Sequence, residues 1–301
     1  MTRVAPSGSE IRAPVIILGA PRSGTTLLAD LLGAHPDVVV IQEPRLVWRY
    51  GNDRLSDQLR AEHARPEVIA HIHDSFAAMI GRHGATMVEK TPANSVRPHF
   101  VDAIFPDARY VHITRNGWSA VPSIRDFSVR RGSGLDRRQL KKVGRRLREA
   151  ELGQVAHYLP ELVRRLSGPL DRGPSIYGPR LAGLSSVARE LGQLETAALQ
   201  WRTCVDSAGV FGRQLPGERY LEIQLERLGE DALHRVLDHC GLPVAPEVVE
   251  RFRSTYRPEA GQRRATITDA ERAVIASYVV PANAQLGYPE PSVGSAPAGP
   301  G

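Results

Sequence analysis

The sequence predicts a three-layer α/β fold, in which helices flank a central parallel sheet and a helical insert is added. Short apolar runs alternate with longer amphipathic segments along the chain, which is the order of strands and helices in such a fold. The first apolar run passes through a tight glycine-containing loop directly into a helical pattern. With 301 residues, 42% of them hydrophobic, the chain can bury a large core as a single domain.

Each element follows from its local pattern. Apolar runs bounded by turn-forming residues predict strands at 14–19, 37–42, 86–89, 108–114 and 218–224. Apolar residues at helical spacing predict helices at 24–34, 55–82, 95–104, 116–128, 137–167, 184–213, 229–240, 246–256 and 268–285. Residues 1–288 are expected to form one domain, and the tail 289–301, rich in Pro, Gly, Ser and Ala, is expected to be disordered.

The loop at residues 19–26 joins the first predicted strand to the first predicted helix. A glycine-bearing loop at a helix start aims several backbone N–H groups at one point, where the helix dipole adds positive potential. Thr25 and Thr26 supply hydroxyl donors, and Arg22 supplies a permanent charge with a planar set of donors. The expected guest is a phosphate or sulfate group, although a tight turn without a ligand would use a similar sequence.

The same loop departs from the nucleotide triphosphate-binding pattern at one position. Gly19 and Gly24 have the spacing of a Walker A motif, but Thr25 stands where that motif has its lysine. Because the lysine serves the β- and γ-phosphates, its replacement argues against an ATPase or a kinase. A donor that carries only a 5′ phosphate-type group remains compatible with the loop.

Polar residues also follow other predicted strands. Gly19, Glu43, Lys90 and Arg115 each end or follow an apolar run. Because ligands of open α/β sheets bind at the carboxyl ends of the strands, we expect these four positions to converge. Ser123 lies two helical turns beyond Arg115, so the two side chains can face one anion. For this pair alone, a surface arginine and a routine helix serine would be the better explanation, and it is the presence of two anion sites in this order that argues against it.

The loop resembles a known family. It is similar to the 5′-phosphosulfate loop of sulfotransferases, which use 3′-phosphoadenosine 5′-phosphosulfate (PAPS) as the sulfuryl donor. The similar residues are Pro21, Arg22, Ser23, Gly24, Thr25 and Thr26, followed by Leu27-Leu28 and Ala34-His35-Pro36-Asp37. The arginine variant is most similar to the protein-tyrosine and carbohydrate branches. The resemblance implies a P-loop-type α/β fold without a metal, and it covers residues 14–125 well and 195–287 weakly.

The resemblance also implies donor-binding roles. Residues 21–26 would hold the 5′-phosphosulfate, and Arg115 with Ser123 would hold the 3′-phosphate. Trp201 lies where related enzymes place an aromatic ring against adenine, but a core tryptophan explains it almost as well. Arg264 resembles the late basic element that touches the 3′-phosphate, and it could equally belong to a basic loop.

The catalytic roles are likewise carried over from the resemblance. Glu43, in an E-x-R pattern with Arg45, would be the general base, since tyrosylprotein sulfotransferases place a glutamate at this distance from the loop arginine. The alternative is a strand-end carboxylate that merely pairs with Arg45. Lys90, in an E-K-T-P run, and Arg22 would stabilise the departing oxygen. Glu89, next to Lys90, either pairs with it or points elsewhere.

Composition bounds the partners and the location. The net charge of +6 suits an anionic donor, and no nucleic-acid-binding motif accompanies it. Two cysteines give no disulfide framework, and no Cys/His cluster has metal spacing. His71 and His73 are rival bases, but their spacing places them on different helix faces. Without an apolar run of membrane length or a signal start, the sequence predicts a cytoplasmic protein with no stable membrane insertion. A homodimer is left open.

The acceptor is expected to bind near the basic insert at residues 129–182, which would form a lid. Arginine and lysine pairs followed by a Gly/Pro-rich stretch suggest either an acceptor site for an anionic molecule or a solvated basic face. The acceptor hydroxyl could belong to a peptide tyrosine, a carbohydrate, a lipid or a natural product, and the products would be a sulfate ester and 3′-phosphoadenosine 5′-phosphate (PAP). Two alternatives remain: a P-loop small-molecule kinase or NTPase, and a non-catalytic PAP-binding protein.

Overall fold

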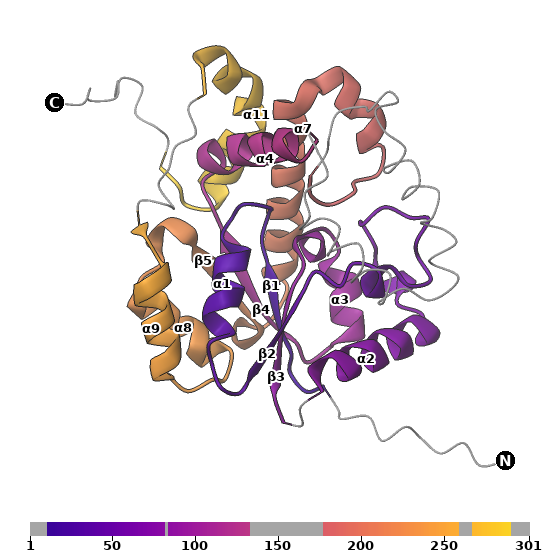
Figure 1. Ribbon diagram of the computed structural model, residues 1–301. Coiled ribbons are helices and arrows are strands. Elements are labelled where there is room, and N and C mark those ends of the chain that lie inside the picture. Colours follow the sequence, from indigo (N-terminus) through magenta and orange to yellow (C-terminus); the bar gives the residue numbers. More distant parts are fainter. Residues whose placement is uncertain (1–10, 82–83, 133–176, 259–266, 290–301) are drawn as a thin grey trace.

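Five parallel strands form the central sheet of the computed structural model, which describes residues 11–81, 84–132, 177–258 and 267–289 (Figure 1). The strand order is β2-β3-β1-β4-β5, and every neighbouring pair is parallel. The strands are β1 (Val15–Leu18), β2 (Val38–Gln42), β3 (Thr86–Lys90), β4 (Arg109–Thr114) and β5 (Tyr220–Gln224). All five lie where the sequence predicts them, and the α/β fold class is confirmed.

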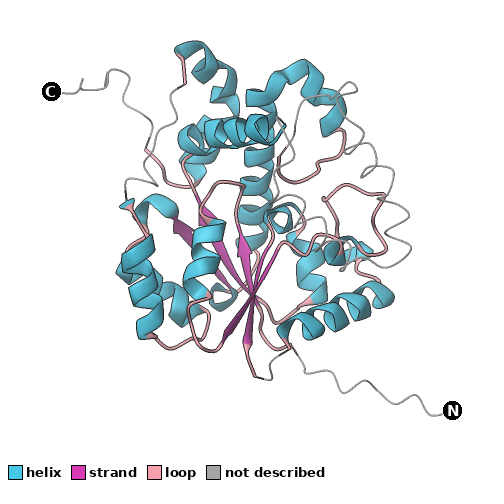
Figure 2. Ribbon diagram, in the orientation of Figure 1, coloured by secondary structure: helices cyan, strands magenta, loops and turns pink. Residues whose placement is uncertain are grey.

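The central strand β1 has no solvent-exposed residue, as expected for a parallel strand covered on both faces. Its side chains alternate between two cores. Val15 and Ile17 join the core under α1, α8 and α9, whereas Ile16 and Leu18 join the core under α2 and α3. Figure 2 shows the strands between these helical layers. The loop after β1 therefore leaves from the middle of the sheet.

The helices surround the sheet in three groups. Figure 1 shows α1, α8 and α9 on one side, α2 and α3 on the other, and α4 and α11 packed against α7, whose C-terminal half extends into the core under α2 and α3. Their bounds are α1 (Thr25–Leu32), α2 (Pro66–Ile80), α3 (Pro98–Ile104), α4 (Gly117–Gly132), α7 (Leu184–Gly212), α8 (Glu230–His239), α9 (Pro246–Thr255) and α11 (Asp269–Gln285). Short 3₁₀ turns are η1 (Val47–Arg49), η2 (Ala61–His63), η3 (Pro92–Val96), η4 (Gly217–Arg219) and η5 (Leu225–Arg227).

Two predicted helices begin later than expected. The helix predicted from residue 55 begins at Pro66, because a residue before proline avoids the helical region and Arg65 is extended at φ −67° and ψ 156°. The helix predicted at 95–104 is divided into η3 and α3, since Arg97, before Pro98, has φ −140°. A third helix, α7, is interrupted at Gly192, which has a positive φ of 73°.

Several predictions fall outside the described residues. They include the helix at 137–167, Arg264 and nearly all of the tail. The described ends of the predicted insert are its first residues, which continue α4 to Gly132, and its last ones, from Tyr177 onward.

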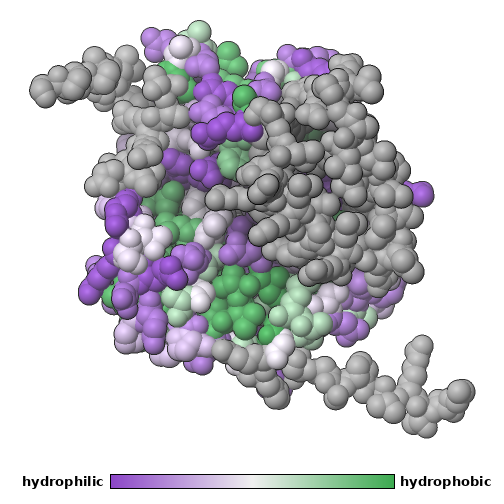
Figure 3. Space-filling model, in the orientation of Figure 1, coloured by the Kyte–Doolittle hydropathy of each residue, from purple (hydrophilic) through white to green (hydrophobic). Residues whose placement is uncertain are grey.

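Hydrophobic side chains of the described residues gather on the face shown in Figure 3. They lie in the lower centre of that view, between the α8–α9 pair and α2.

Candidate functional site

A pocket of about 310 Å³ lies at the carboxyl ends of the strands. Each strand contributes to it through a residue at or just beyond its end: Gly24 in the loop after β1, Glu43 after β2, Lys90 in β3, Arg115 after β4 and Leu225 after β5. Glu43, Lys90 and Arg115 therefore converge as the sequence predicts, whereas Gly19 does not line the pocket and Gly24 of the same loop does.

The loop after β1 enters the pocket in a left-handed conformation. Arg22 has φ 68° and Gly24 has φ 92°. A Cβ on Gly24 would lie 2.8 Å from the Leu225 side chain, so this position requires glycine both for its conformation and for space. The Ser95 hydroxyl accepts a hydrogen bond of 2.7 Å from the Gly19 amide, and this contact fixes the start of the loop.

Helix α1 presents an uncapped N-terminus to the pocket. Its N-cap, Gly24, makes no side-chain capping bond, and the first turn has no acidic residue. The N–H groups of that turn, which includes Thr25 and Thr26 on the pocket wall, have no intrahelical acceptor. The Ser23 hydroxyl is buried and has no hydrogen-bond partner among the described residues. These unmet donors suit an anion such as a phosphate or sulfate group.

Two arginines flank this loop. Arg22 is exposed, and its Nε donates to the Ser123 hydroxyl at 3.2 Å while its guanidinium lies 5.2 Å from the centre of the Phe127 ring. Arg115 is buried, and its guanidinium donates to the Arg22 carbonyl at 3.0 Å. Burial lowers the pKa of Arg115, against the attraction of Glu226. Arg115 and Ser123 thus both contact Arg22, one at its carbonyl and the other at its side chain, and Ser123 is not among the residues that line the pocket.

The predicted base and lysine form an ion pair. The Lys90 ammonium donates to Glu43 Oε1 at 3.0 Å, and the Arg45 guanidinium donates to Glu43 Oε2 at 3.0 Å. Lys90 is 3% exposed and Glu43 is 18% exposed, so the pair is largely shielded from water. Glu43 has a positive φ of 54°, and its amide donates to the Lys90 carbonyl, extending the β2–β3 pairing by one residue.

Some predicted residues lie away from the pocket wall. Trp201 is fully buried among α4, α7 and α11, where a Cβ on Gly117 would come within 2.6 Å of its ring. This is the core position that the sequence left open, next to the turn that carries Arg115. The rival histidines are also distant from the lining: His71 stacks on Tyr50, and His73 stacks on Phe105.

Sequence reasoning missed part of the pocket wall. Tyr256 and Arg257 line it just after the end of α9, and Tyr177 lines it at the end of the predicted insert. The nearest sequence signal was the basic stretch around Arg264, several residues further along. No strand end carries these residues, so the rule that found the others could not reach them.

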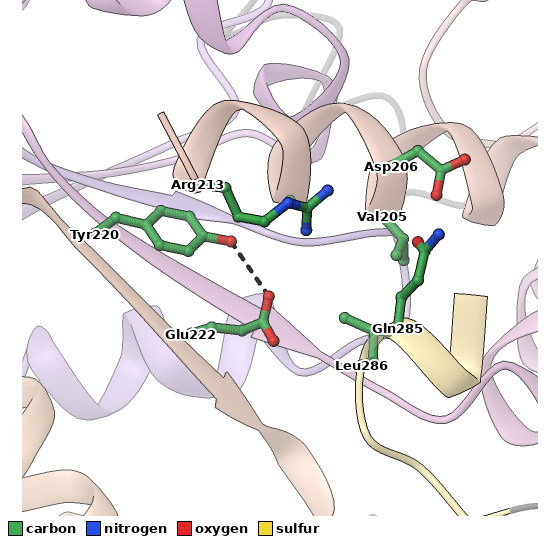
Figure 4. Close-up of a pocket in the computed structure, with 8 residues that line it drawn as sticks. Val205, Asp206, Arg213, Tyr220, Glu222, Gln285 and Leu286 are labelled. Atoms are coloured by element: carbon green, nitrogen blue, oxygen red, sulfur yellow. Dashed lines mark hydrogen bonds between the residues drawn. The ribbon is translucent and has the colours of Figure 1, made fainter. Parts of the chain in front are cut away.

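A second pocket, of about 300 Å³, lies between α7, β5 and the end of α11 (Figure 4). Figure 4 shows Asp206 and Arg213 from α7 and its C-terminus on one wall, and Glu222 from β5 on another. The Tyr220 hydroxyl donates to Glu222 at 3.3 Å. Its walls carry both charge signs, and the residues that line it include none of the predicted site residues.

The described residues offer neither a metal site nor a membrane-spanning helix. Within the ranges that the structure covers, no three His, Cys, Asp or Glu residues are arranged to hold a metal ion. None of the described helices combines the length and the apolar character needed to cross a bilayer.

Comparison with known proteins gives a consistent result. A sequence model described as the sulfotransferase family matches residues 14–164, half of the chain. "Protein-tyrosine sulfotransferase A" of Caenorhabditis elegans is 31% identical over 122 residues, or 36% of this chain and 32% of the relative. The "Nodulation protein NoeE" of Sinorhizobium fredii is 27% identical over 131 residues, or 36% of this chain and 30% of that protein. The chain thus spans about a third of the length of these relatives.

Structural comparison supports the same fold. The sulfotransferase domain of the Synechococcus PCC 7002 olefin synthase has a TM-score of 0.55 and 16% sequence identity. The similarity covers 95% of this chain and 98% of that domain. The likeness therefore extends beyond the matched N-terminal half and includes the C-terminal helices.

Proposed function

The chain belongs to the sulfotransferase family, and on that premise we propose that it moves the sulfuryl group of PAPS to a hydroxyl acceptor, giving a sulfate ester and PAP. The observation that carries this proposal is the convergence of the strand ends. An uncapped helix N-terminus, a buried arginine and a shielded Glu43–Lys90 ion pair meet in one pocket. An anion-binding site beside a carboxylate and an ammonium has the parts that sulfuryl transfer requires.

The residues present fit the donor's two anionic ends. The unmet donors of the loop, among them the buried Ser23 hydroxyl and the first-turn amides at Thr25 and Thr26, would hold the 5′-phosphosulfate. Arg115 and Ser123 would hold the 3′-phosphate, since both already contact Arg22 beside the loop. The donor set is entirely made of N–H and O–H groups, which matches an anionic ligand.

The chemistry would be direct in-line transfer. Glu43 would accept the proton of the acceptor hydroxyl, because it is the carboxylate at the pocket and the ion pair fixes its position. Lys90 would donate to the oxygen that bridges phosphate and sulfate, where negative charge develops as the sulfuryl group leaves. Arg22, exposed at the mouth, would contact the sulfuryl oxygens or the same bridge.

The acceptor is proposed only as a hydroxyl compound. One relative is named for protein tyrosine, so a tyrosyl peptide is the first acceptor to test, followed by carbohydrates, lipids and phenolic natural products. Tyr177, at the described end of the predicted insert, lines the pocket, which supports an acceptor position beside this residue.

Calorimetric titration with PAP and, separately, with ATP–Mg²⁺ tests the donor assignment. We expect PAP to bind without added metal and at least about 100-fold more tightly than ATP–Mg²⁺. Metal-dependent ATP binding would instead support a P-loop kinase or NTPase, for which the loop lacks the Walker lysine.

A second assay tests turnover. PAPS labelled with ³⁵S would be incubated with the protein and a panel of hydroxyl acceptors, and PAP formation would be measured in parallel. Sulfate transfer to an acceptor is expected. PAP binding without sulfate transfer to any acceptor class would identify a non-catalytic PAP-binding protein. In that case the Glu43→Gln variant should bind PAP as tightly as the wild type.

A further inference from the structure

Two consecutive residues at the end of β3 carry opposite charges to opposite faces of the sheet. Lys90 points toward the pocket, where it meets Glu43. Glu89 points into the core under α2 and α3 and has no solvent exposure. Its register partners on the neighbouring strands, Ile16 and Ile41, are both apolar members of that core. The sequence left open whether Glu89 pairs with Lys90, and the structure separates them.

Glu89 accepts hydrogen bonds from three neutral side chains. Its Oε1 accepts from the Trp48 indole at 3.0 Å and from the Thr91 hydroxyl at 2.5 Å. Its Oε2 accepts from the Asn94 amide at 2.8 Å. The Asn94 carbonyl in turn accepts from the buried Arg97 guanidinium at 2.8 Å, so a chain of hydrogen bonds joins the two buried charges. Arg97 also lies over the Trp48 ring at 5.5 Å.

These three donors come from the two loops that carry the proposed catalytic groups. Trp48 lies in η1, in the segment that begins at Glu43. Thr91 follows Lys90 directly, and Asn94 lies in η3. A single carboxylate on the face covered by α2 and α3 therefore bonds to both loops, whereas Lys90 meets Glu43 in the pocket at the strand ends. Where the two loops meet above the sheet, the Glu43–Lys90 distance is 3.0 Å.

We propose that Glu89 is a positioning residue, whose buried carboxylate ties the Glu43 loop to the Lys90 loop and so sets the separation of these two groups. This inference rests on the proposed function, because it takes Glu43 and Lys90 as the groups that do the chemistry. Glu89 itself touches neither the pocket nor any group proposed to bind substrate.

An amide could not replace this carboxylate without breaking the hydrogen-bond chain. All three neighbours donate, so the site needs an acceptor at both oxygens. In a Glu89→Gln variant, one end of the amide becomes a donor and faces a donor of Trp48, Thr91 or Asn94. If Asn94 rotates to accept from it, the Asn94 amide nitrogen then faces the Arg97 donor. One donor–donor contact remains in every arrangement, and a buried donor without an acceptor is costly.

Burial raises the pKa of Glu89 to about 7. Burial of the charged form therefore costs free energy at this position, a cost that an apolar side chain would not incur. The hydrogen bonds that offset this cost among the described residues come from the two loops, through Trp48, Thr91 and Asn94.

The main experiment compares Glu89→Gln with wild type in three measurements. Because misplacement of reacting groups by an ångström costs up to about 100-fold, we expect kcat to fall about 10- to 100-fold. The KM for PAPS and the calorimetric Kd for PAP should change less than about threefold, since Arg115 and the α1 terminus are untouched. Hydrogen exchange should accelerate together in the amides of the segments at 43–50 and 91–97.

The matched control is Asp102→Asn. Asp102 also accepts two side-chain hydrogen bonds, from Tyr110 and Arg219, and lies away from the pocket lining. It should lower the melting temperature without changing kcat. If Glu89→Gln does not fold, Thr91→Val removes one donor with little change of shape and should lower kcat in the same direction by a smaller factor.

A rescue variant tests the hydrogen-bond chain itself. When Glu89→Gln is combined with Asn94→Asp, the carbonyl of the new amide at position 89 accepts from Trp48 and Thr91. The nitrogen of that amide donates to the new carboxylate at position 94, which also accepts from Arg97. The donors of Trp48 and Thr91, the new amide and Arg97 Nε then each face an acceptor again, so kcat should recover to within about threefold of wild type, and the exchange rates of both segments should recover with it.

The outcomes separate this inference from the proposed function. Unchanged kcat and unchanged exchange in a folded Glu89→Gln variant would overturn the positioning role, and so would equal losses in kcat and PAP affinity. If wild type binds no PAP or transfers no sulfate, the proposed function fails. The exchange measurement still decides whether Glu89 ties the two loops.

Discussion

Arg115→Ala offers the most direct test of how the donor is bound. Arg115 is 7% exposed at the end of β4, and its guanidinium braces the loop through the Arg22 carbonyl at 3.0 Å. Burial lowers its pKa, so the folded protein already bears a cost for keeping this charge in the pocket wall. An arriving phosphate would offset that cost by supplying a counter-charge. The arginine should therefore matter more to the complex than to the free protein.

The magnitude follows from the hydrogen bonds that are lost. A hydrogen bond to a charged group contributes about 1.5–3 kcal/mol, which corresponds to a 10- to 150-fold change in affinity. The stability of the free protein should change less. The substitution removes the hydrogen bond to the Arg22 carbonyl, but it also removes the cost of burying the charge, and the two effects oppose each other. We expect a rise of at least about tenfold in the Kd for PAP, with a shift of only a few degrees in melting temperature.

The assay is a cycle of two proteins and two ligands. PAP and adenosine 5′-monophosphate differ only in the 3′-phosphate, so titrating both into wild type and Arg115→Ala isolates that contact. The variant should lose affinity for PAP and keep its affinity for the monophosphate. Arg253→Ala, which removes an exposed arginine paired with Glu230, controls for the change in net charge. Equal losses for both ligands, or no loss for PAP, would refute the assignment of Arg115 to the 3′-phosphate.

Three further predictions follow from the same geometry. Glu43→Gln should bind PAP within about threefold of wild type and lose about 100-fold or more in kcat, and a retained kcat would exclude Glu43 as the base. Gly24→Ala should cost about 1–3 kcal/mol of stability in urea unfolding and abolish PAP binding, because φ is 92° and the new Cβ would lie 2.8 Å from Leu225; an unaltered midpoint would contradict the strained loop. The pKa of Glu89 is raised from 4.5 to about 7, so between these pH values the folded protein binds more protons than the unfolded chain. The free energy of unfolding therefore falls as the pH rises from 4.5 to 7. The stability of Glu89→Gln relative to wild type should therefore improve by about 3 kcal/mol across that range, and a constant difference would show that the carboxylate does not titrate there.

The strands and the pocket were predictable from sequence for one physical reason. In a parallel sheet covered on both faces, each strand is a mostly apolar run, and polar residues gather where that run ends. Glu43, Lys90 and Arg115 were identified in this way, and the fold brings them to the same pocket. The same rule cannot find Tyr256 or Arg257, which reach the pocket from the end of a helix on the sheet's flank.

The errors in helix boundaries have a local cause. Residues 55–65 have apolar spacing compatible with a helix, but the proline at 66 excludes a helical conformation for Arg65. The role of Trp201 could not be predicted from sequence, because a tryptophan on a long helix fits the same pattern whether it contacts a ligand or fills the core. Only the packing of Gly117 against its ring distinguishes the two readings.

Backbone strain and buried charges, both of which lower the stability of the fold, are concentrated around one pocket. Of the three described non-glycine residues with positive φ, Arg22 and Glu43 both line it. A residue held in that region costs about 1 kcal/mol or more and persists only when its surroundings impose it. Nearby, Arg115 keeps its charge with a lowered pKa, and Glu89 keeps a carboxylate in an apolar core.

Each of these features fixes the direction of a polar group at the strand ends. The left-handed Arg22 and Gly24 turn the loop toward the start of α1, and the left-handed Glu43 sets its carboxylate against Lys90. Burial of Glu89 joins the loops that carry the latter two groups. Replacing Arg22 by glycine, which relieves the left-handed strain at this position, should therefore stabilise the protein or leave its stability unchanged, and still reduce turnover. Substitutions of residues that line the second pocket, between α7 and β5, should leave turnover unaltered.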